Sequence, residues 1–244
     1  MEESNLTISI AHLYPELLNL YGDLGNIITL KKRCEWRNIK VEINNINIGD
    51  KIGNNDLYFI GGGQDKQQED VAKELYSRKA ELTDRMEAGA VFLGICGGYQ
   101  LFGHYYQPHG KEKLKGISLL DIYTVAGKNR FIGNVTVKTD FLTPDTLVGF
   151  ENHSGLTYLE GNTKPLGKSI TGHGNNGCDG FEGARYKNVF GTYLHGSLLP
   201  KNPQFADYLI ELALEKRYGK KIQLKPLDDK IEINTHNSLV NKPY

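Results

Sequence analysis

An apolar run that ends in a cysteine between glycines constrains the fold more than any other stretch of this chain. Residues 90–101 read AVFLGICGGYQL, so a segment of strand length reaches Cys96 and then passes into residues that can form a helix. A strand that stops at a nucleophile and turns sharply into a helix is a nucleophile elbow. Such a turn needs small neighbours, which Gly94, Gly97 and Gly98 provide. The start of the helix also favours the thiolate.

The run therefore predicts that Cys96 is a nucleophile. The alternative is an inert cysteine buried as a small hydrophobic residue at the end of a strand. Three glycines within three residues of Cys96 disfavour that alternative, because a core cysteine does not require them.

Length, charge and cysteine content exclude several classes of protein. A chain of 244 residues can form one α/β domain or two small ones. The 29 basic and 29 acidic residues give no net charge, which argues against a nucleic-acid or polyanion binder. Three scattered cysteines do not form a disulfide framework, which indicates a reducing compartment. No signal peptide and no apolar run of about 20 residues is visible. We therefore expect a soluble cytoplasmic protein without membrane insertion.

The first hundred residues alternate between strand and helix patterns. Strands are expected at 6–13, 40–44, 56–60 and 90–96, with one helix that places Ile27, Leu30, Cys34 and Trp36 at helical spacing and a longer helix over about 64–87. This order predicts an α/β fold with a mainly parallel sheet covered by helices on both faces.

The second half of the chain begins with hairpin patterns. Strands are expected at 119–124, 133–138 and 147–150, followed by a glycine-rich loop over 172–180. Residues 188–194 form another apolar strand, which ends at His195. A helix should begin at about residue 203. We expect residues 1–225 to form one domain and the polar residues 226–244 to be a loose tail.

Three strand ends carry candidate chemistry. Ligands of open α/β sheets bind outside the carboxyl ends of the strands, where Cys96, His195 and the glycines of 61–63 are expected. If the strands of Cys96 and His195 are neighbours, the thiol and the imidazole meet. The glycine triplet can bring backbone N–H groups to an oxyanion, and the alternative interpretation is a flexible loop. His173 and Cys178 lack the partners of a zinc site, so no metal is expected.

Several motifs together resemble a known family. Residues 94–100 (GICGGYQ) resemble the G-x-C-x-G-x-Q signature of class I, triad-type glutamine amidotransferases, and residues 191–196 (GTYLHG) resemble their histidine motif. Residues 149–155 (GFENHSG) are similar to the substrate-side loop of the cobyric-acid-synthase-like subgroup. With residues 18–28, 59–63 and 129–130, the set is most similar to the glutaminase subunits of lipid II isoglutaminyl synthases.

The resemblance implies a flavodoxin-like domain that hydrolyses L-glutamine. Cys96 would attack the side-chain carbonyl, His195 would transfer protons, and the N–H groups of Gly97 and Gly62 would hold the oxyanion. Arg130 and Gln100 match positions that bind glutamine.

The resemblance also implies a partner. Ammonia would pass within a heterodimer to a MurT-type, Mur-ligase-like synthetase, which would use ATP and Mg²⁺ to amidate D-glutamate in the lipid II stem peptide. The chain itself would need no cofactor.

One position departs from the family pattern. Many class I enzymes carry a carboxylate two residues after the histidine, where this chain has Ser197. The site is therefore either a Cys–His dyad or is completed by another acid, for which Asp23, Glu151 and an acid of the partner are the candidates.

Two other functions stay open at this point. The chain could be an amidotransferase subunit for another carboxylate acceptor, such as a corrin, or a binding module that keeps the elbow without turnover.

Overall fold

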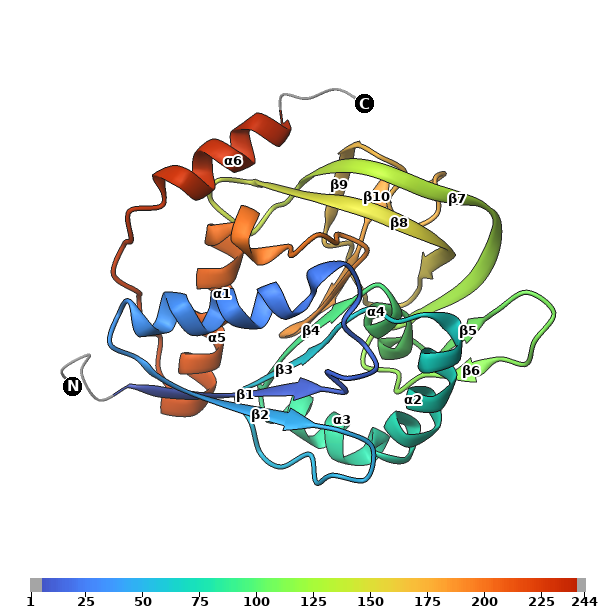
Figure 1. Cartoon of the computed structure of the whole chain (residues 1–244), viewed down its shortest axis with the longest axis horizontal. Helices are drawn as coiled ribbons and strands as arrows, with labels where there is room; N and C mark the ends of the chain where they lie inside the picture. The colour runs from blue at the N-terminus through green and yellow to red at the C-terminus, as the bar shows by residue number, and fades with distance from the viewer. Residues whose placement is uncertain (1–5, 241–244) are drawn as a thin grey trace.

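A computed structural model describes residues 6–240, and its centre is a six-stranded sheet (Figure 1). The strand order is β11-β12-β4-β3-β1-β2, in which β11 alone is antiparallel to its neighbour. The strands are β1 (Thr7–Leu13), β2 (Lys40–Ile46), β3 (Leu57–Ile60), β4 (Val91–Ile95), β11 (Ala184–Tyr186) and β12 (Val189–Thr192). The predicted parallel sheet is confirmed, and β4 and β12 are neighbours within it.

Helices cover both faces of this sheet, as the alternation of strands and helices predicted. One face packs against α1 (Leu24–Glu35) and α5 (Pro203–Tyr218), and the other against α2 (Asp65–Ser77), α3 (Lys79–Glu87) and α4 (Gly97–Phe102). The single long helix expected over 64–87 is wrong, because the chain breaks at Arg78 into α2 and α3. Two short 3₁₀ helices, η2 (Leu20–Gly22) and η3 (Leu199–Lys201), precede α1 and α5 in the chain.

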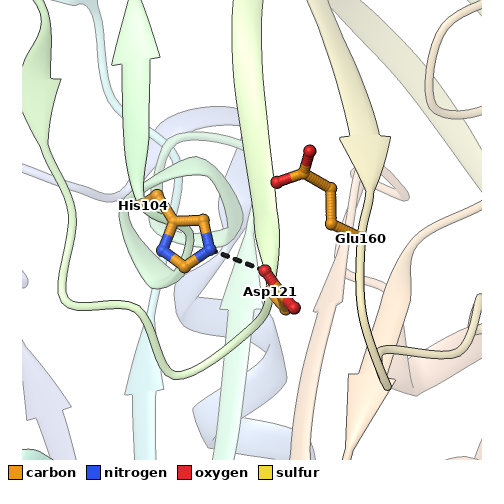
Figure 2. A group of neighbouring side chains, drawn as sticks. All are labelled: His104, Asp121 and Glu160. Carbon is orange, nitrogen blue, oxygen red and sulfur yellow. Dashed lines mark hydrogen bonds and ion pairs between the residues drawn. The ribbon is translucent and has the colours of Figure 1, made fainter.

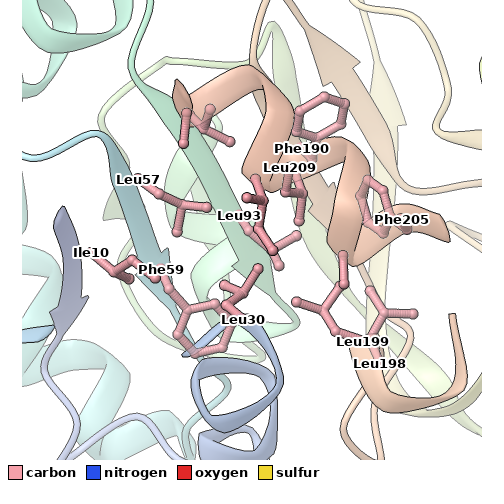
Figure 3. Packing of buried hydrophobic residues seen from close by; sticks show 14 of the residues in the cluster. Ile10, Leu30, Leu57, Phe59, Leu93, Phe190, Leu198, Leu199, Phe205 and Leu209 are labelled. Atoms are coloured by element: carbon pink, nitrogen blue, oxygen red, sulfur yellow. The ribbon is translucent and has the colours of Figure 1, made fainter. Parts of the chain in front are cut away.

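An apolar core lies between the sheet and the helices α1 and α5 (Figure 3). Side chains of β3, β4 and β12 interdigitate there with those of the two helices, among them Leu57, Phe59, Leu93, Phe190, Leu30, Phe205 and Leu209. Each has no more than 2% of its surface exposed. Trp36, which the helical spacing placed with the buried stripe of α1, is instead 59% exposed at the end of the helix.

A second sheet lies beyond the carboxyl ends of the first. Its strand order is β10-β9-β7-β5-β6, and β8 pairs with β7. The strands are β5 (Tyr105–Gln107), β6 (Leu114–Lys115), β7 (Ile122–Lys138), β8 (Thr146–Leu159), β9 (Gly167–Thr171) and β10 (Phe181–Glu182). The expected strand at 133–138 and residues 122–124 of the one expected at 119–124 belong to one long strand, β7, which bulges between Ala126 and Phe131, whereas residues 119–121 precede it. A bridge between Phe150 of β8 and His195 joins the two sheets.

The C-terminal segment differs from the loose tail that its polarity predicted. Residues of α6 (Lys230–Val240) form a helix, and its His236 is 3% exposed. The imidazole of His236 contacts the hydroxyl of Thr146 and the carbonyl of Lys201. The expected domain boundary at residue 225 stays a prediction, and residues 241–244 lie outside the described part. Within residues 6–240, no helix has the length and apolar character needed to cross a membrane.

A buried ionic cluster ties this C-terminal segment to the domain. The guanidinium of Arg33, with 2% of its side chain exposed, lies 2.6 Å from a carboxylate oxygen of Asp207 on α5 and 2.6 Å from one of Asp229. Arg37 contacts the same carboxylate of Asp207 at 2.6 Å. One buried cation therefore joins α1, α5 and the start of α6.

We predict that Arg33→Ala lowers the free energy of unfolding by about 3 kcal/mol, because truncating one partner of a buried ion pair leaves the other charges uncompensated. Urea unfolding measures this change. Lys32→Ala is the matched control, since Lys32 pairs with Glu35 on the surface with 54% of its side chain exposed. It should cost less than about 0.5 kcal/mol, and equal losses in both variants would contradict the assignment.

Candidate active site

Cys96 lies at the tip of a strained turn between β4 and α4, as the elbow predicts. Its φ of 50° and ψ of −102° place a non-glycine residue in the left-handed half of the backbone map. The N–H of Cys96 donates to the carbonyl of Thr192 on β12 at 2.8 Å. A Cβ at Gly98 would lie 2.5 Å from the carbonyl oxygen of Ile60, so only glycine fits beside the turn. Cys96 is itself partly exposed.

His195 lies beside Cys96, three residues beyond the end of β12. The parallel register aligns Thr192 with Ile95, so the two strands end at the same level. The distances around Gly62 locate the pair: a Cβ there would be 3.1 Å from His195 Cε1 and 3.3 Å from Cys96 Cβ. The structure thus brings together the two residues that the sequence singled out at separate strand ends.

The surroundings of His195 favour its protonated form. Burial lowers the pKa of this imidazole, since His195 has no exposed surface. The negative charge of Cys96 and the attraction of Asp23 outweigh burial, and the pKa is raised to about 10. The charges around His195 therefore favour its imidazolium form at neutral pH.

Gly62 does not offer the backbone donor that the sequence assigned to it. Its N–H donates to Oδ2 of the buried Asp23 at 2.7 Å, which turns this group away from an oxyanion. The next glycine is better placed, because Gly63 lines the cleft in front of Cys96 and its nitrogen would lie 3.3 Å from a Cβ at Gly97. The sequence pointed to the triplet as a whole, and no local pattern in it distinguishes the N–H of Gly62 from that of Gly63.

A cleft of about 770 Å³ opens in front of Cys96. Its walls come from the second sheet, from the start of α2 and from the turn and helix that follow β4, and among the described side chains that line it are three cations, Lys66, Lys111 and Arg130, and no carboxylate. Lys111 is paired with Glu69 at 2.5 Å. The cleft is therefore suited to a small ligand that carries an anionic group.

Arg130 is exposed at the bulge of β7 and lines this cleft. Its Nε donates to Oδ1 of Asn152 on β8 at 2.6 Å, which fixes the direction of the side chain. The sequence placed Arg130 in a loop between two strands, and the structure places it on one continuous strand whose bulge turns it toward the cleft.

Gln100 also lines the cleft, one turn of α4 beyond Cys96. Its amide is held from two sides: Oε1 accepts from Gln68 at 2.8 Å, and Nε2 donates to the hydroxyl of Tyr193 at 3.1 Å. A Cβ at Gly155 would lie 2.4 Å from that Nε2. Sequence reasoning missed Gln68 and Tyr193, although Tyr193 lies within the quoted histidine motif.

Of the three positions considered for the group that orients His195, two contact other parts of the chain and one lies near the imidazole. The hydroxyl of Ser197 donates to the carbonyl of Gly22 at 2.6 Å. Glu151 is buried and accepts from the backbone and ring of His173. Asp23 is the near one, with Oδ1 3.9 Å from Nδ1 of His195 and no exposed surface.

A group of possible metal ligands lies at the edge of the second sheet (Figure 2). The donor atoms of His104, Asp121 and Glu160 lie within 4.8 Å of one another. His104 already forms an ion pair with Asp121 at 2.7 Å, and both side chains are about 40% exposed. None of the three lines the cleft of Cys96, and we describe the group as a surface ion pair with a neighbouring acid.

Comparison with known proteins agrees with this geometry. Residues 9–203 match the CobB/CobQ-like glutamine amidotransferase domain. The chain is 44% identical over 238 residues to the lipid II isoglutaminyl synthase (glutamine-hydrolyzing) subunit GatD of Staphylococcus aureus, covering 96% of each chain. It is 40% identical to the subunit of the same name from Streptococcus pneumoniae, covering 91% of this chain and 86% of the relative.

More distant relatives share part of the chain or only the fold. A probable cobyric acid synthase of Methanococcus maripaludis is 32% identical over 69% of this chain, but the match spans 35% of that protein. The solved structure of PurLQS from Thermotoga maritima is 16% identical with a TM-score of 0.58, covering 88% of this chain and 99% of that one. This likeness confirms the fold.

Glu182 lies behind the site and was not anticipated from the sequence. Its carboxyl group, with no exposed surface, contacts the hydroxyl of Thr192 at 2.9 Å and the N–H of Tyr193 at 2.7 Å. Burial raises its pKa from an ordinary 4.5 to about 8, although these hydrogen bonds act in the opposite direction. A carboxyl group with a raised pKa stabilises the fold fully below pH 4.5, and this contribution is lost as the pH rises toward 8.

We predict that the stability advantage of Glu182→Gln, which cannot ionise, over the natural chain grows by about 3 kcal/mol as the pH rises from 5 to 8. Urea unfolding at the two pH values measures the difference. The exposed Glu112→Gln is the control and should show no such change. A constant difference between Glu182→Gln and the natural chain would refute the prediction.

Proposed function

The chain belongs to the CobB/CobQ-like glutamine amidotransferase family, and we propose that it is the glutamine-hydrolysing subunit of a lipid II isoglutaminyl synthase. The observation that carries the proposal is the meeting of Cys96 and His195 at adjoining strand ends, in front of a cationic cleft. The relatives named for this activity match nearly the full length of the chain.

The chemistry proceeds in two halves through a thioester. The Cys96 thiolate attacks the side-chain carbonyl carbon of glutamine and forms a tetrahedral oxyanion. His195, as imidazolium, donates its proton to the amide nitrogen; the C–N bond breaks and ammonia leaves. The neutral imidazole then takes a proton from water, whose oxygen attacks the thioester. Collapse of the second oxyanion releases glutamate and restores the thiolate and the imidazolium.

Two backbone donors would stabilise the oxyanion. We assign the N–H of Gly97, as the sequence suggested, and replace Gly62 by Gly63, since Gly62 donates to Asp23. Donors fixed in this way need no reorganisation when the charge forms. The glycines on the cleft side allow the carbonyl of the substrate to approach the backbone.

Arg130 would bind the α-carboxylate of glutamine. Its Nε is held by Asn152, which leaves the terminal nitrogens of the guanidinium for a carboxylate in the cleft. Gln100 would shape the floor beneath the substrate, because Gln68 and Tyr193 hold its amide in place. No cofactor takes part in this half of the reaction.

The ammonia would be used by a second subunit. The GatD relatives are named as subunits of a synthase, which implies a partner chain for them. For this chain we infer a MurT-type, Mur-ligase-like synthetase in a heterodimer, which would use ATP and Mg²⁺ in the cytoplasm to amidate D-glutamate of the lipid II stem. A corrin acceptor is less well supported, because the match to cobyric acid synthase covers only about a third of that protein.

We predict that Cys96→Ala lowers glutamate release, measured with the partner synthetase present, by at least about a thousandfold, because the thioester cannot form. The exposed Cys178→Ala is the matched control and should keep the rate of the natural chain. Undiminished glutamate release from Cys96→Ala would end the proposal.

We also predict that Arg130→Lys raises the KM for glutamine about tenfold with little change in kcat, because a lysine cannot form the forked pair with a carboxylate. Steady-state glutaminase kinetics distinguish the two parameters. An unchanged KM would remove Arg130 from the substrate site.

A further inference from the structure

We propose that Asp23 is the residue that positions His195, supplying from the turn before α1 the carboxylate that is absent at position 197. The proposal deepens the proposed glutaminase function and rests on it. Of the two candidate acids within this chain, it selects Asp23 by geometry, since Glu151 is engaged with His173.

The side chain of Asp23 serves the site rather than its own helix. Asp23 occupies the N-cap of α1, where an aspartate ordinarily accepts a backbone N–H of the first turn, yet it makes no such bond. The N–H of Leu24 is satisfied instead by Asn19 Oδ1 at 2.8 Å. Asp23 turns inward, where Oδ2 accepts the N–H of Gly62 at 2.7 Å.

The second carboxylate oxygen of Asp23 points toward the imidazole. Oδ1 is buried without a hydrogen-bond partner in the described part of the chain, and it lies 3.9 Å from His195 Nδ1. An unpaired buried carboxylate oxygen is costly unless a positive charge faces it. Protonated His195 supplies that charge, so the opposite charges of the two buried groups compensate each other.

Ser197 holds the turn that carries Asp23. Its hydroxyl donates to the carbonyl of Gly22 at 2.6 Å, and a Cβ at Gly25 would lie only 2.2 Å from its Oγ. The N–H of Leu199 donates to Asn26 Oδ1 at 2.9 Å, which adds a second tie. The segment after His195 thus holds the turn before α1, and this turn carries Asp23.

None of the other charged or titratable side chains that the structure describes around the pair replaces Asp23. His12 on β1 is buried near Asp23, and burial lowers its pKa to about 4, so it is neutral. On β8, burial lowers the pKa of His153 to about 4, and Glu151 lies 4.0 Å from that ring. Lys201 contacts the carbonyl of His195 at 3.5 Å rather than its ring.

Asp23 would hold the Nδ1–H of His195 toward itself, which leaves Nε2 for the Cys96 sulfur and for the leaving ammonia. It would also stabilise the imidazolium. Removing its charge should therefore lower the pKa of His195, and the imidazolium would be lost at a lower pH.

The test is Asp23→Asn, which keeps an oxygen for the Gly62 N–H and removes the charge. Histidine labelled with ¹³C at Cε1 reports the pKa of His195 by NMR titration of the full chain, with the signal assigned through His195→Gln. We expect the pKa to fall by about one unit or more. In glutaminase assays with the partner present, kcat should fall at least tenfold at an unchanged KM, and the alkaline limb of the pH profile should move to lower pH.

Glu151→Gln is the matched control, because it removes an equally buried carboxylate from the neighbouring strand and should leave the titration of His195 unchanged. Ser197→Ala is a second variant that keeps the charge but loosens the turn, and it should give a smaller shift in the same direction. The proposal is overturned if Asp23→Asn leaves the His195 titration unchanged, or if Glu151→Gln moves it instead. The titration needs no glutamine turnover, so its result stands apart from a failure of the glutaminase assignment.

Discussion

The pairing of β4 with β12 is the constraint on which the site depends. Both strands are parallel and in register, so that Ile95 faces Thr192 and the next residues leave the sheet together. The bond from the Cys96 N–H to the Thr192 carbonyl fixes the nucleophile to the partner strand at the point of the turn. A slip by one residue would reverse the direction of every side chain on β12 and separate the thiol from the imidazole.

The second sheet supplies walls of the cleft in front of Cys96. Strand β8 crosses the carboxyl ends of the central strands, where Phe150 forms its bridge with His195 and Gly155 lies over Gln100. Strand β8 and its neighbour β7, which carries Arg130, together form a wall of the cleft in front of Cys96. Cys96 and His195 therefore follow strands of the central sheet, whereas Arg130 lies on the second sheet.

The sequence revealed the features that are local and left out those that depend on distant packing. The strand, the cysteine and the glycines of the elbow are consecutive in the sequence, so their pattern predicted the turn at Cys96. The apolar run before His195 predicted the strand β12 in the same way. The direction of the Gly62 N–H depends on Asp23, which is 39 residues away, and no local pattern encodes it. The helix α6 was missed because few of its residues are apolar and His236 is its one buried residue.

The charges of the site divide between a buried acid beside His195 and the cations that line the open cleft. The buried carboxylate of Asp23 would repel the anionic end of glutamine if that end entered beside His195. Lys66 and Arg130, which line the cleft, would instead attract that end. We therefore expect the charges of the site to favour glutamine bound with its amide, rather than its α-carboxylate, toward Cys96.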